Sequence, residues 1–381
     1  MRALPRFLQY PLTVFTGKPL PGQSPLKWTP TFHLAAATAN VLAGVAVSLT
    51  ATALGGWWLL MLAVGWAATL HGLRNLRMMV YHQCSHRNMY RRPRLDTALG
   101  RTISGMLLIQ NFARYSSEHV SDHHAAHHMT LRDPTVQAFL IALGLHPGMT
   151  RRQMWRRLVG KLLSPGFHAA FAVSRARSFW HGSANAEKAG ALSFWGLLAS
   201  VAAVTGSWAA VLIAWLIPLL PLFQVSNTLR LCVKHTFPPA GTSTRRGREY
   251  FASLTNAVFI GQPAPRPGLA PGRRALAWAW WTLRMLCLHA PSRYLVLTGD
   301  TVVHDFHHRH PASREWADYL FARERDVQSG CQGWPEYREV WGLIPAINYV
   351  FDSLSTADAA EYDAKLLRST SRRELFAAFD D

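Results

Sequence analysis

The stretch "WTPTFHLAAATANVLAGVAVSLTATALGGWWLLMLAVGWAATLHGL", residues 28–73, contains no Lys, Arg, Asp or Glu. It is about twice as long as the ~20 apolar residues with which an α-helix crosses a bilayer. The small residues of "ALGGWW", residues 53–58, interrupt it near its middle. The stretch therefore predicts a helical hairpin, with spans at about 33–53 and 56–73.

A second charge-free tract covers residues 189–229, and "TGSW" at 205–208 divides it. It predicts two more spans, at about 190–205 and 208–226. Charged residues make up only 16% of the 381 residues, which is low for a soluble protein. We expect an all-α integral membrane protein with four transmembrane helices in two hairpins. A cytoplasmic helical cap would carry the remaining functional residues.

The charge distribution predicts the orientation. The net charge is +19, and the turns inside both hairpins carry no charge. Basic runs lie elsewhere, as in "RRPRLDTALGR" (91–101) and "RRQMWRRLVGK" (151–161). Cytoplasmic loops of membrane proteins carry an excess of Lys and Arg, so we expect both termini and residues 74–188 in the cytoplasm. The membrane would be a bacterial inner membrane. This basic surface suits anionic lipid or an acidic partner, and no nucleic-acid motif is present.

Twelve of the 18 histidines fall in four clusters, each next to the predicted cytoplasmic side of a span. Residues three and four apart share a helical face, so each multi-residue cluster can point several imidazoles one way. The second cluster allows two registers, His119 with His123 and His124, or His124 with His127 and His128. The four clusters are His82 and His86; His119, His123, His124, His127 and His128; His235; and His304, His307, His308 and His310.

Neutral imidazole is a good ligand for Fe, Cu, Zn and Ni. The clusters offer too many ligands for one metal ion. They suit two ions with four or five ligands each, held where helices leave the membrane.

The order of these features resembles the membrane fatty acid desaturase superfamily, which includes hydroxylases and alkane monooxygenases. The matching motifs are His82-x-x-x-His86, the box within "YSSEHVSDHHAAHHMTLRDPT" (115–135), and His304-x-x-His307-His308. A further His after the fourth span matches His235. The resemblance covers roughly residues 30–315. It implies a cytoplasmic tail at 1–32, a desaturase-like domain at 33–315 and a cytoplasmic C-terminal region at 316–381.

The resemblance also implies two Fe ions bound by nine histidines. Asp133-Pro134, nine residues after His124, favours the H-x-x-x-H-H register, and the shorter register through His127 and His128 stays open. Lys234 precedes His235, where many relatives have an acidic residue. The expected ligands are His82, His86, His119, His123, His124, His235, His304, His307 and His308, with His127 and His128 as further candidates.

The reaction implied is O₂-dependent introduction of a C=C bond into an acyl chain. The substrate would be an acyl-lipid, acyl-CoA or acyl carrier protein, and an external ferredoxin, cytochrome b5 or rubredoxin would supply electrons. Metal-bound imidazoles usually donate their second N–H to an acceptor. Four acids beside the clusters are candidates for this role: Glu118, Asp122, Asp300 and Asp305.

Two other functions stay open. Hydroxylation or monooxygenation of an acyl chain, alkane or other lipid would use the same metal centre, and the motifs do not separate it from desaturation. A metal transporter with cytoplasmic histidine sensors is disfavoured. A conduction path needs polar groups inside the spans, which contain few besides Asn40 and His71.

Overall fold

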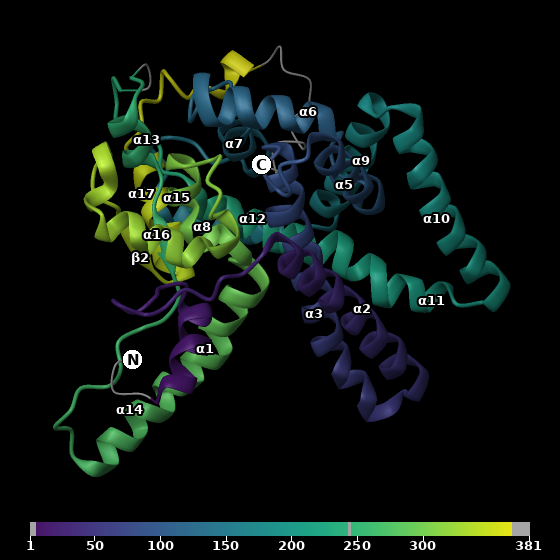
Figure 1. Ribbon diagram of the computed structural model, residues 1–381, viewed down its shortest axis with the longest axis horizontal. Helices are drawn as coiled ribbons and strands as arrows, with labels where there is room; N and C mark the ends of the chain where they lie inside the picture. Colours follow the sequence, from purple (N-terminus) through teal and green to yellow (C-terminus); the bar gives the residue numbers. More distant parts are fainter. Residues whose placement is uncertain (1–4, 243–244, 368–381) are drawn as a thin grey trace.

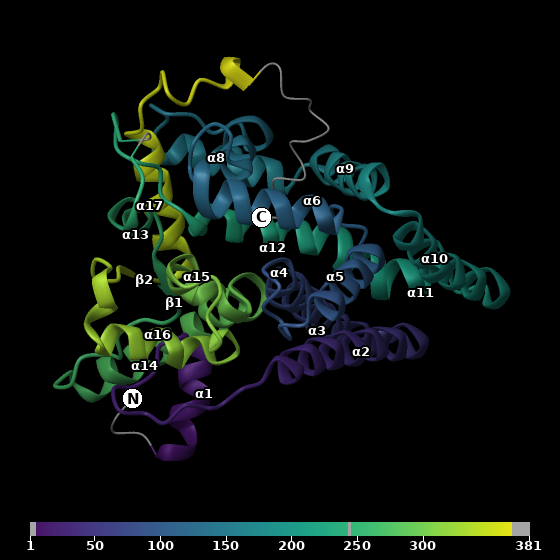
Figure 2. The same cartoon turned by 45° about the horizontal axis from the view of Figure 1, so that its top comes forward.

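The computed structural model describes residues 5–242 and 245–367, and it is mostly helical. Two apolar arms extend from a helical body, one formed by α2 with α3 and the other by α10 with α11 (Figure 1). Helix α12 runs through the body, with α15, α16 and α17 on one side of it (Figures 1 and 2). Part of the predicted C-terminal region, residues 368–381, lies outside the described residues.

The first arm begins with α2, Pro30–Leu54. Pro30 occupies the first helical position, and the Thr29 side chain accepts a hydrogen bond from the Phe32 N–H, which satisfies one free donor of the first turn. After Gly55 a continuous helix runs from Gly56 to Ser85. It comprises η1 (Gly56–Met61), α3 (Leu62–Asn75), the π-helical η2 (Leu76–Tyr81) and α4 (His82–Ser85).

Small residues let the two helices of this arm approach closely. A Cβ on Gly44 would lie 2.4 Å from the backbone nitrogen of Thr69, and one on Gly72 would lie 2.5 Å from the Ala37 carbonyl oxygen. Close backbone contact of this kind is how helices associate where apolar burial supplies no net driving force.

The second arm pairs α10, Asn185–Thr205, with a helix that runs from Trp208 to Lys234. Gly206 turns the chain between them with φ +66°. The second helix comprises α11 (Trp208–Val211), the π-helical η5 (Leu212–Leu216) and η6 (Pro218–Leu222), and α12 (Phe223–Lys234).

All four predicted spans are helices long and apolar enough to cross a membrane. The second and fourth are longer than predicted, because the charged residues that end each apolar tract are buried. Arg74 donates to Asn227 Oδ1 at 2.5 Å and lies over the Phe223 ring. Arg77 lies over the rings of Tyr81 and Tyr115. These contacts let both helices continue into the body.

The all-α prediction missed a small sheet. Strands β1 (Ala257–Phe259) and β2 (Glu339–Trp341) pair in parallel, with Ala257 opposite Glu339. Segments of three residues are too short to show the alternation typical of a strand.

The remaining helices form the body and its edges. They are α1 (Arg6–Thr16), α5 (Pro93–Leu107), α6 (Phe112–Ser117), η3 (Glu118–Ala126), α7 (Pro134–Gln137), η4 (Ala138–Leu143), α8 (Arg151–Leu162), α9 (Pro165–Gly182), α13 (Arg248–Leu254), α14 (Pro271–Arg284), η7 (Met285–His289), η8 (Ser292–Val296), η9 (Gly299–Val303), α15 (His304–Arg309), η10 (Trp316–Asp318), α16 (Tyr319–Gln328), η11 (Gly330–Gly333), α17 (Leu343–Ser355) and η12 (Ala364–Leu367).

Candidate metal centre

Two long helices deliver histidines from the arms to the body. His82 begins α4, the last turn of the helix that includes the second span, and His86 follows that turn. His235 directly follows Lys234, the last residue of α12. The rigid backbone of each span helix therefore fixes where these imidazoles lie.

The second histidine cluster lies on η3, Glu118–Ala126, which is π-helical rather than α-helical. Hydrogen bonds from i to i+5 widen the turn, so residues five apart come to one side. The Nε2 atoms of His119 and His124 are accordingly 3.0 Å apart. His123 faces the end of α12 instead, with its Nε2 atom 3.2 Å from His235 Nε2. The rings of His119 and His123 also stack, with their centroids 5.4 Å apart, so the three histidines lie together although the Nε2 atom of His123 has a different partner.

The third cluster lies on α15, and its histidines also point in two directions. His304 and His308 are four residues apart, and their Nε2 atoms are 3.1 Å apart. His307 turns toward the other side, with its Nε2 atom 3.1 Å from His124 Nε2.

The nine histidines gather into two groups. Within each group, one ring nitrogen per residue lies within 4.8 Å of every other. The two groups adjoin, because the His124 and His308 rings stack with their centroids 4.3 Å apart. The five-histidine group is His82, His86, His119, His124 and His307, and the four-histidine group is His123, His235, His304 and His308.

The nitrogen–nitrogen distances fit metal ligation. Imidazole nitrogens bind a divalent ion such as zinc at about 2.1 Å, so two ligands at a right angle are about 3.0 Å apart. The Nε2 atoms of His82 and His119 are 2.7 Å apart, and the pairs already described are 3.0–3.2 Å apart. His119 Nε2 approaches two other Nε2 atoms at once, and a single ring N–H cannot bond both. Convergent lone pairs on one cation account for this arrangement.

Electrostatics keep these imidazoles ready to bind a cation. Burial lowers the pKa of these rings well below 6.5. Repulsion by the charged forms of neighbouring side chains lowers it further. The rings are therefore neutral at pH 7, each with a lone pair available. This applies to His119, His124, His235, His304, His307 and His308.

A family model for fatty acid desaturases matches residues 56–290, which is more than half of the chain. This chain belongs to the fatty acid desaturase family. The matched segment includes the first two histidine boxes and His235, and the third box on α15 follows it. The comparison with curated proteins found no match. The family and the four apolar helices together indicate a membrane protein, and the family indicates an oxidoreductase.

In the sequence Asp133 indicates only the register of the second box, but in the structure it lies behind His123. Its carboxylate oxygens lie 3.2 and 3.3 Å from His123 Nδ1 and accept from the N–H groups of Met129 and Thr135. Burial alone would raise the pKa of Asp133, but His123 and these donors more than offset it and bring it to about 2. The carboxylate therefore orients His123 with Nε2 toward the four-histidine group.

His127 and His128 have different surroundings. His127 lines a surface pocket with Thr130 and Arg132, outside both groups. His128 is buried, its Nδ1 lies 3.7 Å from Asp133, and its ring lies beside those of His235 and His308. His128, His123 and Asp133 form a third group whose ligand atoms could hold a metal ion, so His128 stays a candidate ligand, whereas His127 belongs to no such group among the described residues.

Of the four acids expected behind the ligands, three contact other residues. Glu118 pairs with Arg114 and accepts from Gln110. Asp300 is hydrogen-bonded to Gln83. The side chain of Asp122 lies outside the described residues.

Asp305 anchors the third box instead of bonding a ring. The Arg323 guanidinium on α16 donates to both of its carboxylate oxygens at 2.9–3.1 Å, and both side chains are buried. A forked ion pair of this kind fixes geometry as well as adding energy. Because α15 supplies His304, His307 and His308, this pair positions ligands of both groups.

Proposed function

We propose that this chain is a membrane-bound, O₂-dependent fatty acyl desaturase that binds two iron ions, one in each histidine group. The observation that carries the proposal is the gathering of nine histidines, from segments far apart in sequence, into two adjoining groups where the span helices enter the body. Membership of the fatty acid desaturase family supports iron and an acyl substrate.

The residues present fit such a centre. Nitrogen ligands of this kind suit iron, and the two groups provide five and four of them. When bound, the two irons would supply an oxidant made from O₂ that can remove hydrogen from an unactivated methylene. The C–H bonds of such a methylene have no useful acidity, so the acids and bases of the chain cannot do this alone.

The chain itself orients the ligands and excludes water. The ligand rings are buried or nearly so, which keeps bulk water from the metals. The span helices, η3, α12 and α15 fix the nitrogens before any metal binds, so little has to rearrange on binding. Asp133 and the Asp305–Arg323 pair hold two of these segments in position.

Electrons would come from a separate protein on the cytoplasmic side. Exposed arginines lie beside the first box at Arg91, Arg92 and Arg94, and on α8 at Arg151 and Arg156. They would attract an acidic donor such as a ferredoxin, cytochrome b5 or rubredoxin. The same residues support an orientation with both termini and the metal centre in the cytoplasm.

The experiment is mass spectrometry of acyl lipids and free fatty acids from cells that express the protein, beside cells that express a His304→Ala variant. Desaturation predicts a new product two mass units lighter than its precursor, absent from the variant. A product sixteen units heavier would assign hydroxylation to the same centre. If the protein contains two irons and an active electron donor is present, the absence of any new product would contradict both desaturation and hydroxylation.

A further inference from the structure

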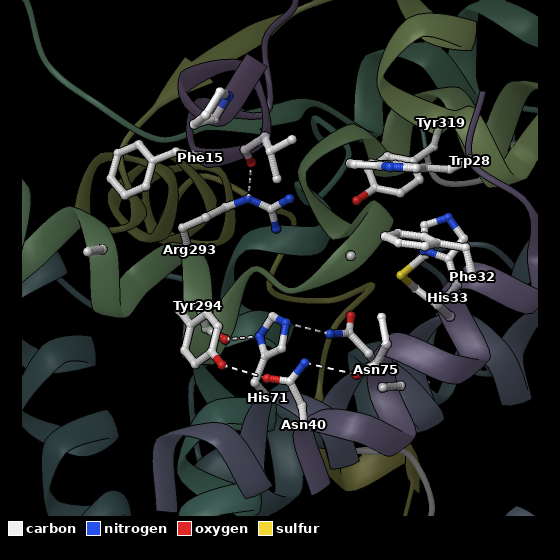
Figure 3. A pocket seen from close by; sticks show the side chains of 17 residues that line it. Phe15, Trp28, Phe32, His33, Asn40, His71, Asn75, Arg293, Tyr294 and Tyr319 are labelled. Atoms are coloured by element: carbon white, nitrogen blue, oxygen red, sulfur yellow. Dashed lines mark hydrogen bonds between the residues drawn. The ribbon is translucent and has the colours of Figure 1, made fainter. Parts of the chain in front are cut away.

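A cavity of about 510 Å³ lies between the first arm and the body (Figure 3). Its walls come from α1, α2, α3, residues 290–299 and Tyr319. Most of the lining is apolar, as in Phe15, Trp28 and Phe32, and the size falls in the range of small-molecule sites.

The inner wall of the cavity adjoins the metal centre. Met79 lines it and lies one turn before His82 on the same helix. Gly299, with φ +55°, packs against Met79 so closely that a Cβ there would lie 2.0 Å from the Met79 sulfur. Gly299 begins the short helix that leads directly into His304. A molecule in the cavity is therefore next to the segments that carry two of the histidine boxes.

The outer side of the cavity lies beside α2, a candidate membrane span. Phe32 on α2 and Tyr294 on η8 line it, and they are 47% and 39% exposed. Because α2 is long and apolar enough to cross a membrane, we expect this opening to face lipid. Helix α14 leads toward it with exposed apolar side chains, Leu276, Trp280 and Leu283.

A fixed hydrogen-bond network leaves one acceptor open in the cavity wall. The Tyr294 carbonyl can only accept, so His71 Nδ1, at 2.7 Å, must carry the ring hydrogen. His71 Nε2 is then an acceptor, and Asn75 Nδ2 donates to it at 2.9 Å. This orients Asn75 Oδ1 toward Gly299, where it is buried and has no hydrogen-bond partner. A buried acceptor without a donor indicates a polar guest.

Arg293 supplies a cation on the other side of the cavity. Its guanidinium donates to the carbonyls of Val14 (3.0 Å) and Leu297 and to the Tyr319 hydroxyl, and it lines the cavity (Figure 3). The side chain is 8% exposed, and among the described residues no carboxylate forms an ion pair with it. Asp300 acts on it only at longer range, and burial raises the pKa of Asp300 to about 7. A buried guanidinium without a close counter-ion favours an anionic ligand.

We infer that this cavity binds an apolar chain with a free carboxylate, which enters from the bilayer and pairs with Arg293. A water that donates one hydrogen to Asn75 Oδ1 and the other to the carboxylate would join these two acceptors. The inference rests on the proposed function and narrows it. The substrate is an unesterified acid, since a carboxylate held here excludes a thioester or phospholipid head group at the same position.

The test measures binding without turnover. Radiolabelled hexadecanoate, hexadecan-1-ol and hexadecane are equilibrated with purified, iron-loaded protein in nanodiscs, for wild type and Arg293→Met. Arg284→Met, an exposed arginine of neighbouring α14, is the matched control. We expect wild type to prefer hexadecanoate. Arg293→Met should weaken hexadecanoate about tenfold or more while leaving hexadecane unchanged. Arg284→Met should match wild type for all three ligands.

Ala36→Phe gives a second test that keeps Arg293. Ala36 lines the cavity from α2, and a phenyl ring there would occupy the space of the chain. It should weaken binding of all three ligands, and bound iron reports that the variant is folded. Equal binding of hexadecanoate and hexadecane by wild type, or hexadecanoate binding unchanged in a folded Arg293→Met, would overturn the inference.

Turnover separates the two proposals. If Arg293-dependent binding of hexadecanoate is found but no oxidised product forms with O₂ and electrons, the cavity assignment stands and the proposed function fails. If an acyl thioester or phospholipid is desaturated while hexadecanoate binding is the same in wild type and Arg293→Met, the function stands and the cavity assignment is overturned.

Discussion

The two histidine groups differ in how their rings are held. In the five-histidine group, His82 and His86 come from one span helix, and Tyr115 stacks on His119 with the ring centroids 5.1 Å apart. In the four-histidine group, the carboxylate of Asp133 holds His123 from behind, and His128 lies beside the other rings. The first group is oriented by rigid helices and aromatic packing, and the second by a buried carboxylate.

The difference also concerns ligand number. A group of five imidazoles can lose one and still match the four ligands of the other group. A group of four that loses one has three. We therefore expect the two sites to respond unequally to equivalent substitutions, which separates two metal sites from one undivided cluster of histidines.

The largest expected effect comes from removing a ligand of the four-histidine group. His304→Ala should lower bound iron from two per chain to about one, and activity should fall by more than the ~100-fold typical of losing an outer partner. His86→Ala, in the five-histidine group, should keep more iron. Metal analysis of purified variants measures both. The control is His168→Ala, a histidine on α9 outside the histidine groups, which should keep both irons. Equal losses in His86→Ala and His304→Ala would remove the distinction between the groups.

Arg323→Met should disturb both groups together, because α15 contributes to each. It leaves Asp305 as a buried charge without its partner, so we expect the protein to lose about 3–5 kcal/mol of stability and to bind less iron at both sites. Thermal unfolding measures the loss. The control is Arg325→Met, which breaks an exposed pair with Glu315 and should cost no more than about 1 kcal/mol. Similar unfolding midpoints for both variants would contradict the anchoring role of Arg323.

Asp133→Asn should weaken only the four-histidine site. The amide oxygen can still accept from the Thr135 N–H, but the substitution removes the negative charge that orients His123. We expect metal affinity to fall about 10–100-fold at this site alone, which competition with a chelator would resolve as one early and one late release of iron. Release of both irons in a single step would mean that Asp133 supports the whole centre.

The smallest expected effect distinguishes His128 from His127. His128→Ala should weaken the four-histidine site by less than about tenfold, because His128 belongs to neither all-histidine group and joins only a third group with His123 and Asp133. His127→Ala, with its ring in a surface pocket, should leave metal binding unchanged. If His128→Ala removed an iron as fully as His304→Ala, His128 would be a ligand.

The sequence predicts the spans well, because apolar length and missing charge are local properties. It also predicts which histidines gather, since their clusters follow the spans. It does not predict how they divide. α-Helical spacing does not predict that His119 and His124, five residues apart, bring their Nε2 atoms together, because this contact depends on the π-helical turn of η3.

The sequence also does not predict contacts between residues far apart in the chain. Nothing near Asp305 indicates Arg323, and nothing near Asn75 indicates Gly299, because each pair meets only in the folded chain. Asp133 was visible as part of an Asp-Pro motif, but its contact with His123 requires the turn at residues 127–133. The cavity has no sequence signature, since five separate segments build its walls.

The central claim is that the nine histidines bind two irons at two defined positions. Anomalous X-ray scattering at the iron absorption edge, from crystals of the iron-loaded protein, tests it most directly. We expect two peaks, one among His82, His86, His119, His124 and His307, and one among His123, His235, His304 and His308. A single peak, or iron at the surface beside His127 or His310, would contradict it.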